Sequence, residues 1–197
     1  MVESASLKGW SRLLHDLRSR RRRFRQFLGW ALVLLFTALG DPRSLTLFAA
    51  GAAVVAAGAV ARLWASGVVH KNKALATGGP YGFVRHPLYT GNLLIATGFC
   101  LASGLWWSPL VVGAFYFGFY PDAIEYEDKK LARLFPGEWP EWAARIPAVV
   151  PRLVRPKSSG PVLEWSFRRS LLENGEPIYA LIVAGCCGWL YFAGFGR

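Results

Sequence analysis

Long apolar stretches restrict the fold of this sequence more than any other feature. Five of them can be drawn, at residues 26–40, 44–65, 88–103, 105–121 and 178–195. Hydrophobic residues make up 53% of the chain and aromatic residues 15%, more than is usual for a soluble domain. A helix needs about 20 residues to cross a bilayer, so the first, third and fourth stretches are short and would use interfacial flanks. The sequence therefore predicts an all-α integral membrane protein with about five transmembrane helices and interfacial amphipathic helices.

The N-terminal arm is basic and amphipathic. Apolar residues recur at helical spacing ahead of an arginine-rich run, at Leu7, Trp10, Leu14 and Leu17. This pattern predicts that residues 1–25 form a basic helix lying in the membrane interface. The alternatives are an uncleaved signal sequence for residues 26–40 and a nucleic-acid-binding role for the arginines. Topogenic and lipid-headgroup roles explain the arginines without a nucleic-acid partner.

The remaining boundaries follow from the spacing of the apolar stretches. Residues 26–153 are predicted to form the membrane core with four spans. Residues 154–177 are predicted to be a cytosolic linker with an amphipathic segment, and residues 178–197 the fifth span.

The distribution of positive charge predicts how the chain is oriented. The basic arm places the N-terminus in the cytoplasm, because positively charged flanks stay inside. Five spans then place residues 66–87 and 122–177 on the same side. With this topology all but Arg43 and Arg197 of the 23 lysine and arginine residues lie inside. We therefore expect an integral protein of a bacterial-type inner membrane, with its N-terminus in the cytoplasm.

Two charged clusters lie at the inner ends of neighbouring predicted spans. Arg85 and His86 precede the third span, and carboxylates follow the fourth, at Glu125, Glu127 and Asp128. The two spans form a hairpin, so their inner ends are neighbours. Ionisable groups at the rim of a membrane bundle are costly unless they are paired or hydrated, and such groups mark functional sites.

A purely structural interpretation of the same residues is open as well. Arg85 could be an ordinary inner-face anchor. Glu125 with Lys129 and Glu127 with Lys130 have the spacing of surface ion pairs on one solvated helix. The three cysteines lie in apolar stretches without metal-ligand spacing, so we expect no metal site.

The order of residues around Arg85 resembles a family signature. The string Gly79-Pro80-Tyr81, Arg85-His86-Pro87, Tyr89, Gly91 is similar to G-P-Y-x-x-x-R-H-P-x-Y-x-G. That signature is typical of the isoprenylcysteine carboxyl methyltransferase and phospholipid methyltransferase superfamily. The superfamily's second motif is matched, in order, by Ile124, Glu127, Asp128, Leu131, Phe135, Trp139 and Trp142, and its hydrophobic-proline end by Val149-Val150-Pro151. The resemblance covers about residues 60 to 153.

The resemblance implies an integral membrane methyltransferase that uses S-adenosyl-L-methionine without a Rossmann domain. Its cofactor would lie at the cytosolic edge and be bound by Leu75, Tyr81, Arg85, His86, Pro87, Leu88, Tyr89 and Glu127. His86, Arg85 and Glu127 would act in catalysis, which would consist mostly of positioning. Arg85 suits the carboxylate of the cofactor and Glu127 one of its cations. The acceptor would be a lipid or lipophilic small molecule, and a homodimer is one possible state.

Several residues depart from the superfamily pattern. Ala123 stands where the carboxyl-methylating enzymes have arginine, Lys73 where they have histidine, and Ser66 where they have glutamine. A carboxylate, a lipid amine, a lipophilic quinol or another apolar nucleophile is therefore open as acceptor. The alternatives are an NADPH-dependent enzyme related to sterol reductases and a non-catalytic membrane scaffold. Leu88 and Asn92 differ from the reductase string, which has Asn and Asp there.

Overall fold

Helices form the part of the chain that the computed structural model describes, residues 24–70, 73–152 and 164–196, and there is no strand in these ranges. A helix at Phe24–Leu39 is followed by α2 (Leu45–Val68), the 3₁₀ turn η1 (Gly79–Gly82), α3 (Pro87–Ser103), α4 (Ser108–Leu134), α5 (Trp139–Arg145), the π-helical turn η2 (Arg169–Glu173) and α6 (Glu176–Phe195). The all-helical prediction is confirmed for these residues. Most of the predicted N-terminal interfacial helix and of the 154–177 linker lies outside them.

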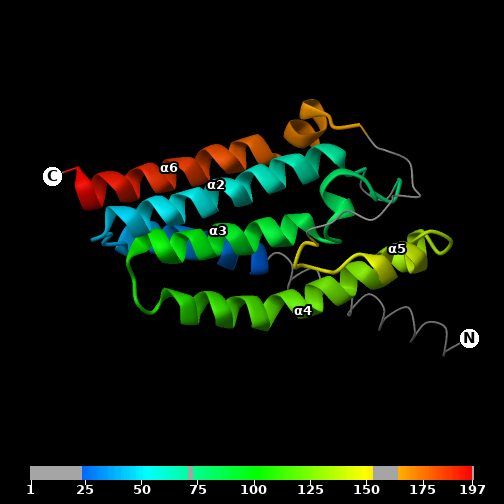
Figure 1. The fold of residues 1–197 in the computed structure, drawn as a ribbon, viewed down its shortest axis with the longest axis horizontal. Coiled ribbons are helices and arrows are strands. Elements are labelled where there is room, and N and C mark those ends of the chain that lie inside the picture. Colours follow the sequence, from blue (N-terminus) through cyan, green and yellow to red (C-terminus); the bar gives the residue numbers. More distant parts are fainter. Residues whose placement is uncertain (1–23, 71–72, 153–163, 197) are drawn as a thin grey trace, which may run out of the picture.

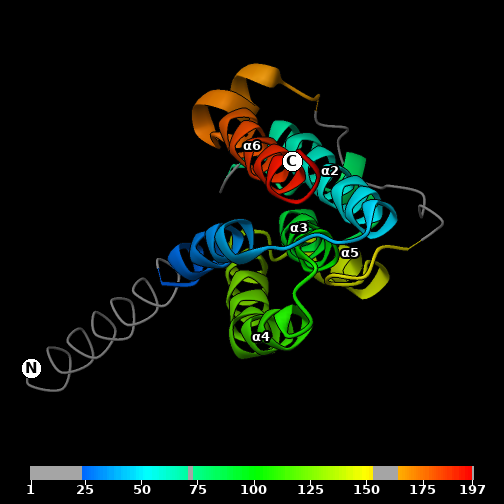
Figure 2. The same ribbon diagram turned by 90° about the vertical axis from the view of Figure 1, so that its left-hand side faces the viewer.

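The long helices form one bundle around α3. Figure 1 shows α2, α3 and α6 side by side, and Figure 2 shows α4 on the opposite side of α3 from α2 and α6. Buried residues from several helices meet in one core, among them Phe36, Phe99 and Leu190. The end of the bundle at which α3 begins also holds η1, α5 and η2 (Figure 1).

Glycines let α2 and α3 pack backbone against backbone. A Cβ atom built on Gly98 of α3 would lie 2.6 Å from the carbonyl oxygen of Gly51 in α2. One built on Gly58 would lie 2.8 Å from the carbonyl oxygen of Gly91. Small residues bring membrane helices together in this way. The α2–α3 pair therefore forms a rigid base for the residues at its ends.

Within the residues that the structure describes, two helices, α2 and α6, are long and apolar enough to cross a membrane. Most of their surface is not covered by the rest of the protein: Leu181 of α6 is 73% exposed and Trp189 64% exposed. Soluble monomers rarely expose apolar surface of this extent, which supports membrane association. The five-span count and the orientation stay predictions.

Two predicted spans have different limits in the structure. The fourth apolar stretch, residues 105–121, is the first part of α4, which continues through Pro121 to Leu134. As a result the carboxylates of residues 125–128 lie on the same helix as the apolar stretch. The fifth predicted span is α6, which begins at Glu176, two residues before the predicted start. Its first turn therefore includes a carboxylate.

Candidate functional site

The first motif and the hydrophobic-proline end are joined by backbone hydrogen bonds. The amides of Arg85 and His86 donate to the carbonyl oxygens of Pro147 (2.8 Å) and Ala148 (3.0 Å). The hydroxyl of Thr90 donates to the carbonyl of Val149 at 2.6 Å. His86 is the residue before α3, and Pro87 begins the helix, where its missing N–H and fixed φ are tolerated. Two segments about 60 residues apart therefore fix the position of the Arg-His pair.

Asp128 of α4 binds both members of that pair. Its Oδ1 lies 2.8 Å from Nε2 of His86, and its Oδ2 lies 3.1 Å from Nη1 of Arg85. His86 is buried, and the side chains of Arg85 and Asp128 are about one fifth exposed. Hydrogen bonds with a charged partner are shorter and stronger than neutral ones. The predicted meeting of the Arg-His pair with the carboxylates is confirmed, through Asp128.

The neighbouring carboxylates point elsewhere. Glu127 makes the predicted surface pair with Lys130 at 3.4 Å, and Glu125 pairs with Lys129. Glu127 nevertheless acts on the site: burial raises the pKa of the Tyr81 hydroxyl well above its ordinary value, and the negative charge of Glu127 raises it further. Both sequence interpretations therefore hold, on different faces of α4.

Aromatic rings line the side of the site that faces the bundle. The His86 and Tyr89 rings are stacked, with centroids 5.4 Å apart, and Tyr89 meets Tyr120 edge to face at 5.4 Å. The guanidinium carbon of Arg25 lies 5.0 Å from the centroid of the Tyr89 ring and 5.4 Å from that of Tyr120. These rings therefore form a surface on which a cation is already bound.

Two buried N–H groups at the site have no acceptor among the described residues. They are Nε of Arg85 and Nε1 of Trp142. Both residues flank Trp139. The guanidinium carbon of Arg85 lies 5.7 Å from the centroid of the Trp139 ring, and the ring centroids of Trp139 and Trp142 are 5.3 Å apart. An unsatisfied buried donor costs about 1–3 kcal/mol. The carboxylate and adenine base of S-adenosyl-L-methionine are acceptors of the kind that would match these donors.

The other predicted cofactor contacts lie at the same end of the bundle. Tyr81 is buried in an apolar cluster against which Leu88 and Trp142 pack. Pro87 is buried at the start of α3. Leu75 is buried in the chain leading to η1, outside that cluster. The structure therefore places Leu88 and Trp142 against the cluster that contains Tyr81, and leaves Leu75 as a buried residue outside it.

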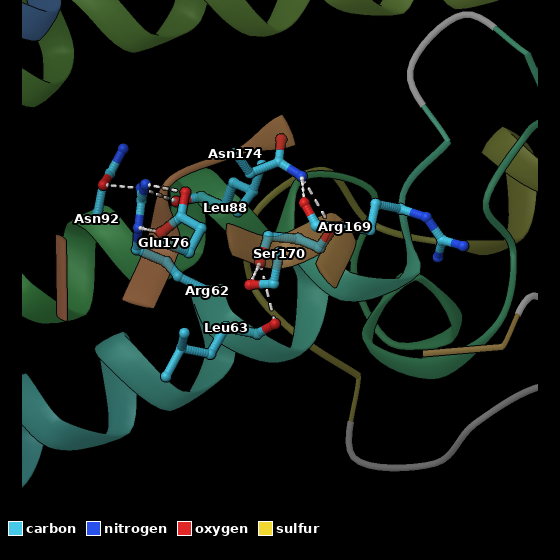
Figure 3. Close-up of polar contacts among 9 residues, drawn as sticks. Arg62, Leu63, Leu88, Asn92, Arg169, Ser170, Asn174 and Glu176 are labelled. Atoms are coloured by element: carbon cyan, nitrogen blue, oxygen red, sulfur yellow. Dashed lines mark hydrogen bonds and ion pairs between the residues drawn. The ribbon is translucent and has the colours of Figure 1, made fainter. Parts of the chain in front are cut away.

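Sequence reasoning missed three polar residues that meet beside the site. Arg62 of α2 forms a two-pronged ion pair with Glu176 of α6, and it also bonds to Asn92 of α3 (Figure 3). In the sequence Arg62 is one of the many positive charges on the predicted inner side, and Glu176 falls within the predicted 154–177 linker. The available signal was a full charge at the end of each of two apolar stretches.

Comparisons with known proteins agree with the motif resemblance. A family model described as phospholipid methyltransferase matches residues 44–138. The chain is 37% identical over 139 residues to the cobalt-zinc-cadmium resistance protein CzcN of Cupriavidus metallidurans, covering 68% of this chain and 62% of that protein. It is 35% identical over 136 residues to the nickel-cobalt-cadmium resistance protein NccN of Alcaligenes xylosoxydans xylosoxydans, covering 66% and 63%.

The extent of these matches is limited. The chain spans a little under two thirds of the length of both relatives. No solved structure matches it significantly.

Proposed function

Because residues 44–138 belong to the phospholipid methyltransferase family, we propose that this protein is an S-adenosyl-L-methionine-dependent methyltransferase acting on a lipophilic acceptor at the cytoplasmic face of a membrane. The observation that carries the proposal is the pair of buried, unpaired donors on Arg85 and Trp142, beside an Arg-His pair held by Asp128. Such an arrangement costs stability in the free protein and is compensated by a ligand with several acceptors.

Each side chain of the site matches one part of the proposed cofactor. Arg85 has Nε free for a carboxylate while Asp128 holds its Nη1. Glu127 is partly exposed and would pair with an ammonium group, and the aromatic rings of Tyr81 and Tyr89 would lie beside a sulfonium or an adenine. His86 has Nε2 bound to Asp128 and its ring stacked on Tyr89. We therefore assign His86 to orienting the site.

The proposed methyl transfer needs little from the protein beyond the positioning of cofactor and acceptor. When bound, S-adenosyl-L-methionine supplies a methyl group whose bond to sulfur breaks as the acceptor nucleophile bonds to carbon. The protein contributes a fixed geometry and a site from which water is excluded, and in-line displacement depends on both. The exposed apolar faces of α2 and α6 suit an acceptor that arrives from the bilayer.

Binding of S-adenosylhomocysteine, the product form of the cofactor, tests the proposal. We expect calorimetry on the full chain in detergent to give micromolar affinity, with no binding of NADPH. His86→Ala should abolish the signal, because it removes the stacked ring and the partner of Asp128. Arg43→Ala should leave it unchanged, since Arg43 pairs with Asp41 at the far end of the bundle. Binding of NADPH in place of S-adenosylhomocysteine would move the chain to the reductase alternative.

Trp142→Phe separates the ligand's effect from the stability of the free protein. The variant removes a buried N–H that has no acceptor and keeps an aromatic ring. We expect the melting temperature without ligand to be unchanged or slightly raised. The rise in melting temperature on adding S-adenosylhomocysteine should become smaller, because one ligand contact is lost. An undiminished rise would show that Trp142 does not donate to the ligand.

The names of the two relatives suggest a setting for this activity. Both are named for resistance to cobalt, cadmium and a further metal. We propose that methyl transfer by this protein contributes to metal tolerance. Growth of a deletion strain on cobalt and cadmium, complemented with the wild-type chain or with His86→Ala, tests this. Rescue by the variant would separate tolerance from methyl transfer.

A further inference from the structure

Arg62 joins three helices with one guanidinium group. Its Nε and Nη2 donate to the two carboxylate oxygens of Glu176 at 2.9 and 2.6 Å. Its Nη1 donates to the carbonyl oxygen of Leu88 at 3.3 Å and to the side-chain oxygen of Asn92. The ring of Tyr179 covers the guanidinium, with 4.3 Å from its carbon to the ring centroid. Figure 3 shows Arg62 between Glu176 and Asn92.

Both charges are withdrawn from solvent. The side chain of Arg62 is 13% exposed and that of Glu176 is 7% exposed. Removing one partner of a buried pair leaves an uncompensated charge, which destabilises a protein far more than replacing both partners by apolar residues. The pair is therefore a poor device for stability alone, and an ion pair near a membrane core is by default a candidate for a functional role.

The start of α6 is fixed to the end of α2 independently of this pair. Asn174 donates to the carbonyl oxygen of Ser66 at 3.0 Å, and the hydroxyls of Ser66 and Ser170 lie 2.6 Å apart. The indole N–H of Trp165 donates to the carbonyl oxygen of Leu63 at 3.2 Å. Figure 3 shows Ser170 and Asn174 beside the part of α2 that carries Arg62 and Leu63. Glu176 is thus presented to Arg62 by a segment that is already anchored.

The contacts of Arg62 fall on the part of α3 that carries the candidate site. Leu88 and Asn92 are one helical turn apart, directly after His86 and Pro87. Leu88 also packs against the cluster that contains Tyr81. Arg62 therefore holds α3 at one point in each of its first two turns. Glu176 lies beyond residues 44–138, the segment that the family model matches.

We propose that Glu176 and Arg62 are positioning residues for the methyl-donor site: Glu176 orients Arg62, and Arg62 fixes the first turn of α3 and with it His86 and Tyr89. This inference rests on the proposed function and adds the C-terminal helix to the site. Without Glu176 the guanidinium loses the partner that holds its plane, and the Leu88 carbonyl loses its second donor.

A double variant separates this role from a structural one. In Arg62→Met with Glu176→Met no charge is left unpaired, so the protein should fold with a melting temperature close to that of the wild type. We expect its affinity for S-adenosylhomocysteine to fall at least tenfold by calorimetry. In turnover assays the KM for S-adenosyl-L-methionine should rise more than kcat falls. Asp41→Asn, which breaks the exposed pair at the other end, is the matched control.

Arg62→Lys is the second variant, in case the apolar pair does not fold. Lysine keeps the charge opposite Glu176 but lacks the planar fork that reaches Leu88 and Asn92 together. It should therefore fold and show the same loss of affinity, whereas Glu176→Asp should retain part of the wild-type affinity. Wild-type affinity in both Arg62→Lys and the double Met variant would overturn the proposal.

Hydrogen exchange of the ligand-free protein tests the role of Arg62 separately from the proposed function. The amides of Tyr89 and Thr90 donate to the carbonyl oxygen of His86 at 2.9 and 3.0 Å. Hydrogen exchange in the peptide covering residues 84–92 should become faster in both variants of Arg62, with exchange in α4 unchanged. If the wild type binds no S-adenosylhomocysteine but this exchange increases in the variants, the methyltransferase proposal fails, while the role of Arg62 in fixing the start of α3 stands. Unchanged exchange would overturn the positioning role whatever the ligand does.

Discussion

Replacing Gly98 by alanine should lower the melting temperature of the protein by many degrees. The added Cβ would lie 2.6 Å from the carbonyl oxygen of Gly51 and 2.7 Å from the backbone nitrogen of Val55. Individual backbone atoms cannot move without the rest of their helix. The whole of α2 therefore has to move away from α3. Overpacking of this kind costs about 1–3 kcal/mol or more. Arg62 and Leu88 lie along the same interface, so binding of S-adenosylhomocysteine should weaken as well.

Gly113→Ala in α4 is the matched control, because a Cβ built there meets nothing within 4 Å. Alanine is favoured over glycine within a helix by about 1 kcal/mol, so this variant should be neutral or slightly stabilising. Thermal unfolding of both variants in the same detergent checks the difference in sign. Equal melting temperatures for the two would contradict the close packing of α2 on α3.

Asp128→Asn should cause the largest loss of ligand binding among the single carboxylate variants. Asp128 has one oxygen on His86 and the other on Arg85, and an amide replaces one of these acceptors with a donor. A hydrogen bond to a charged group is worth about 1.5–3 kcal/mol, which corresponds to tenfold or more in affinity. Calorimetry with S-adenosylhomocysteine should show this loss, and the melting temperature without ligand should fall too.

Two variants sharpen that result. Asp128→Glu keeps the charge and both carboxylate oxygens on a side chain one methylene longer, so most of the binding should remain. Glu127→Gln should weaken binding while leaving the ligand-free melting temperature unchanged, because within the described part of the chain Glu127 is bonded only to Lys130, in a partly exposed pair. Loss of stability in Glu127→Gln with none in Asp128→Asn would reverse the roles assigned to the two carboxylates.

Local signals in the sequence were sufficient for several features of this protein. Apolar stretches predicted the helices, since burial or lipid exposure of a continuous apolar run needs its backbone hydrogen bonds satisfied within the helix. Pro87 and Gly104 mark the two ends of α3, as a helix start and a left-handed helix end. The spacing within the two motifs indicated which segments form the site, and the match to residues 44–138 agrees with it.

The choice of carboxylate at the site was decided by tertiary structure. Adjacent residues of a helix point about 100° apart, so only one of Glu127 and Asp128 can face Arg85 and His86. Sequence reasoning favoured Glu127, while the rotation of α4 about its axis turns Asp128 toward them. That rotation is set by how α4 packs on the rest of the bundle, which the composition of α4 does not specify.

The partnership of Arg62 with Glu176 likewise depends on the assembled bundle. The two residues are 114 positions apart, on helices that each look like an ordinary apolar span. The sequence by itself determined that this chain forms apolar helices with an Arg-His pair next to carboxylates at one end. Only the tertiary structure decided which charges meet, because ion pairing needs atoms within about 4 Å, and that distance is fixed by the packing of α2, α3 and α6.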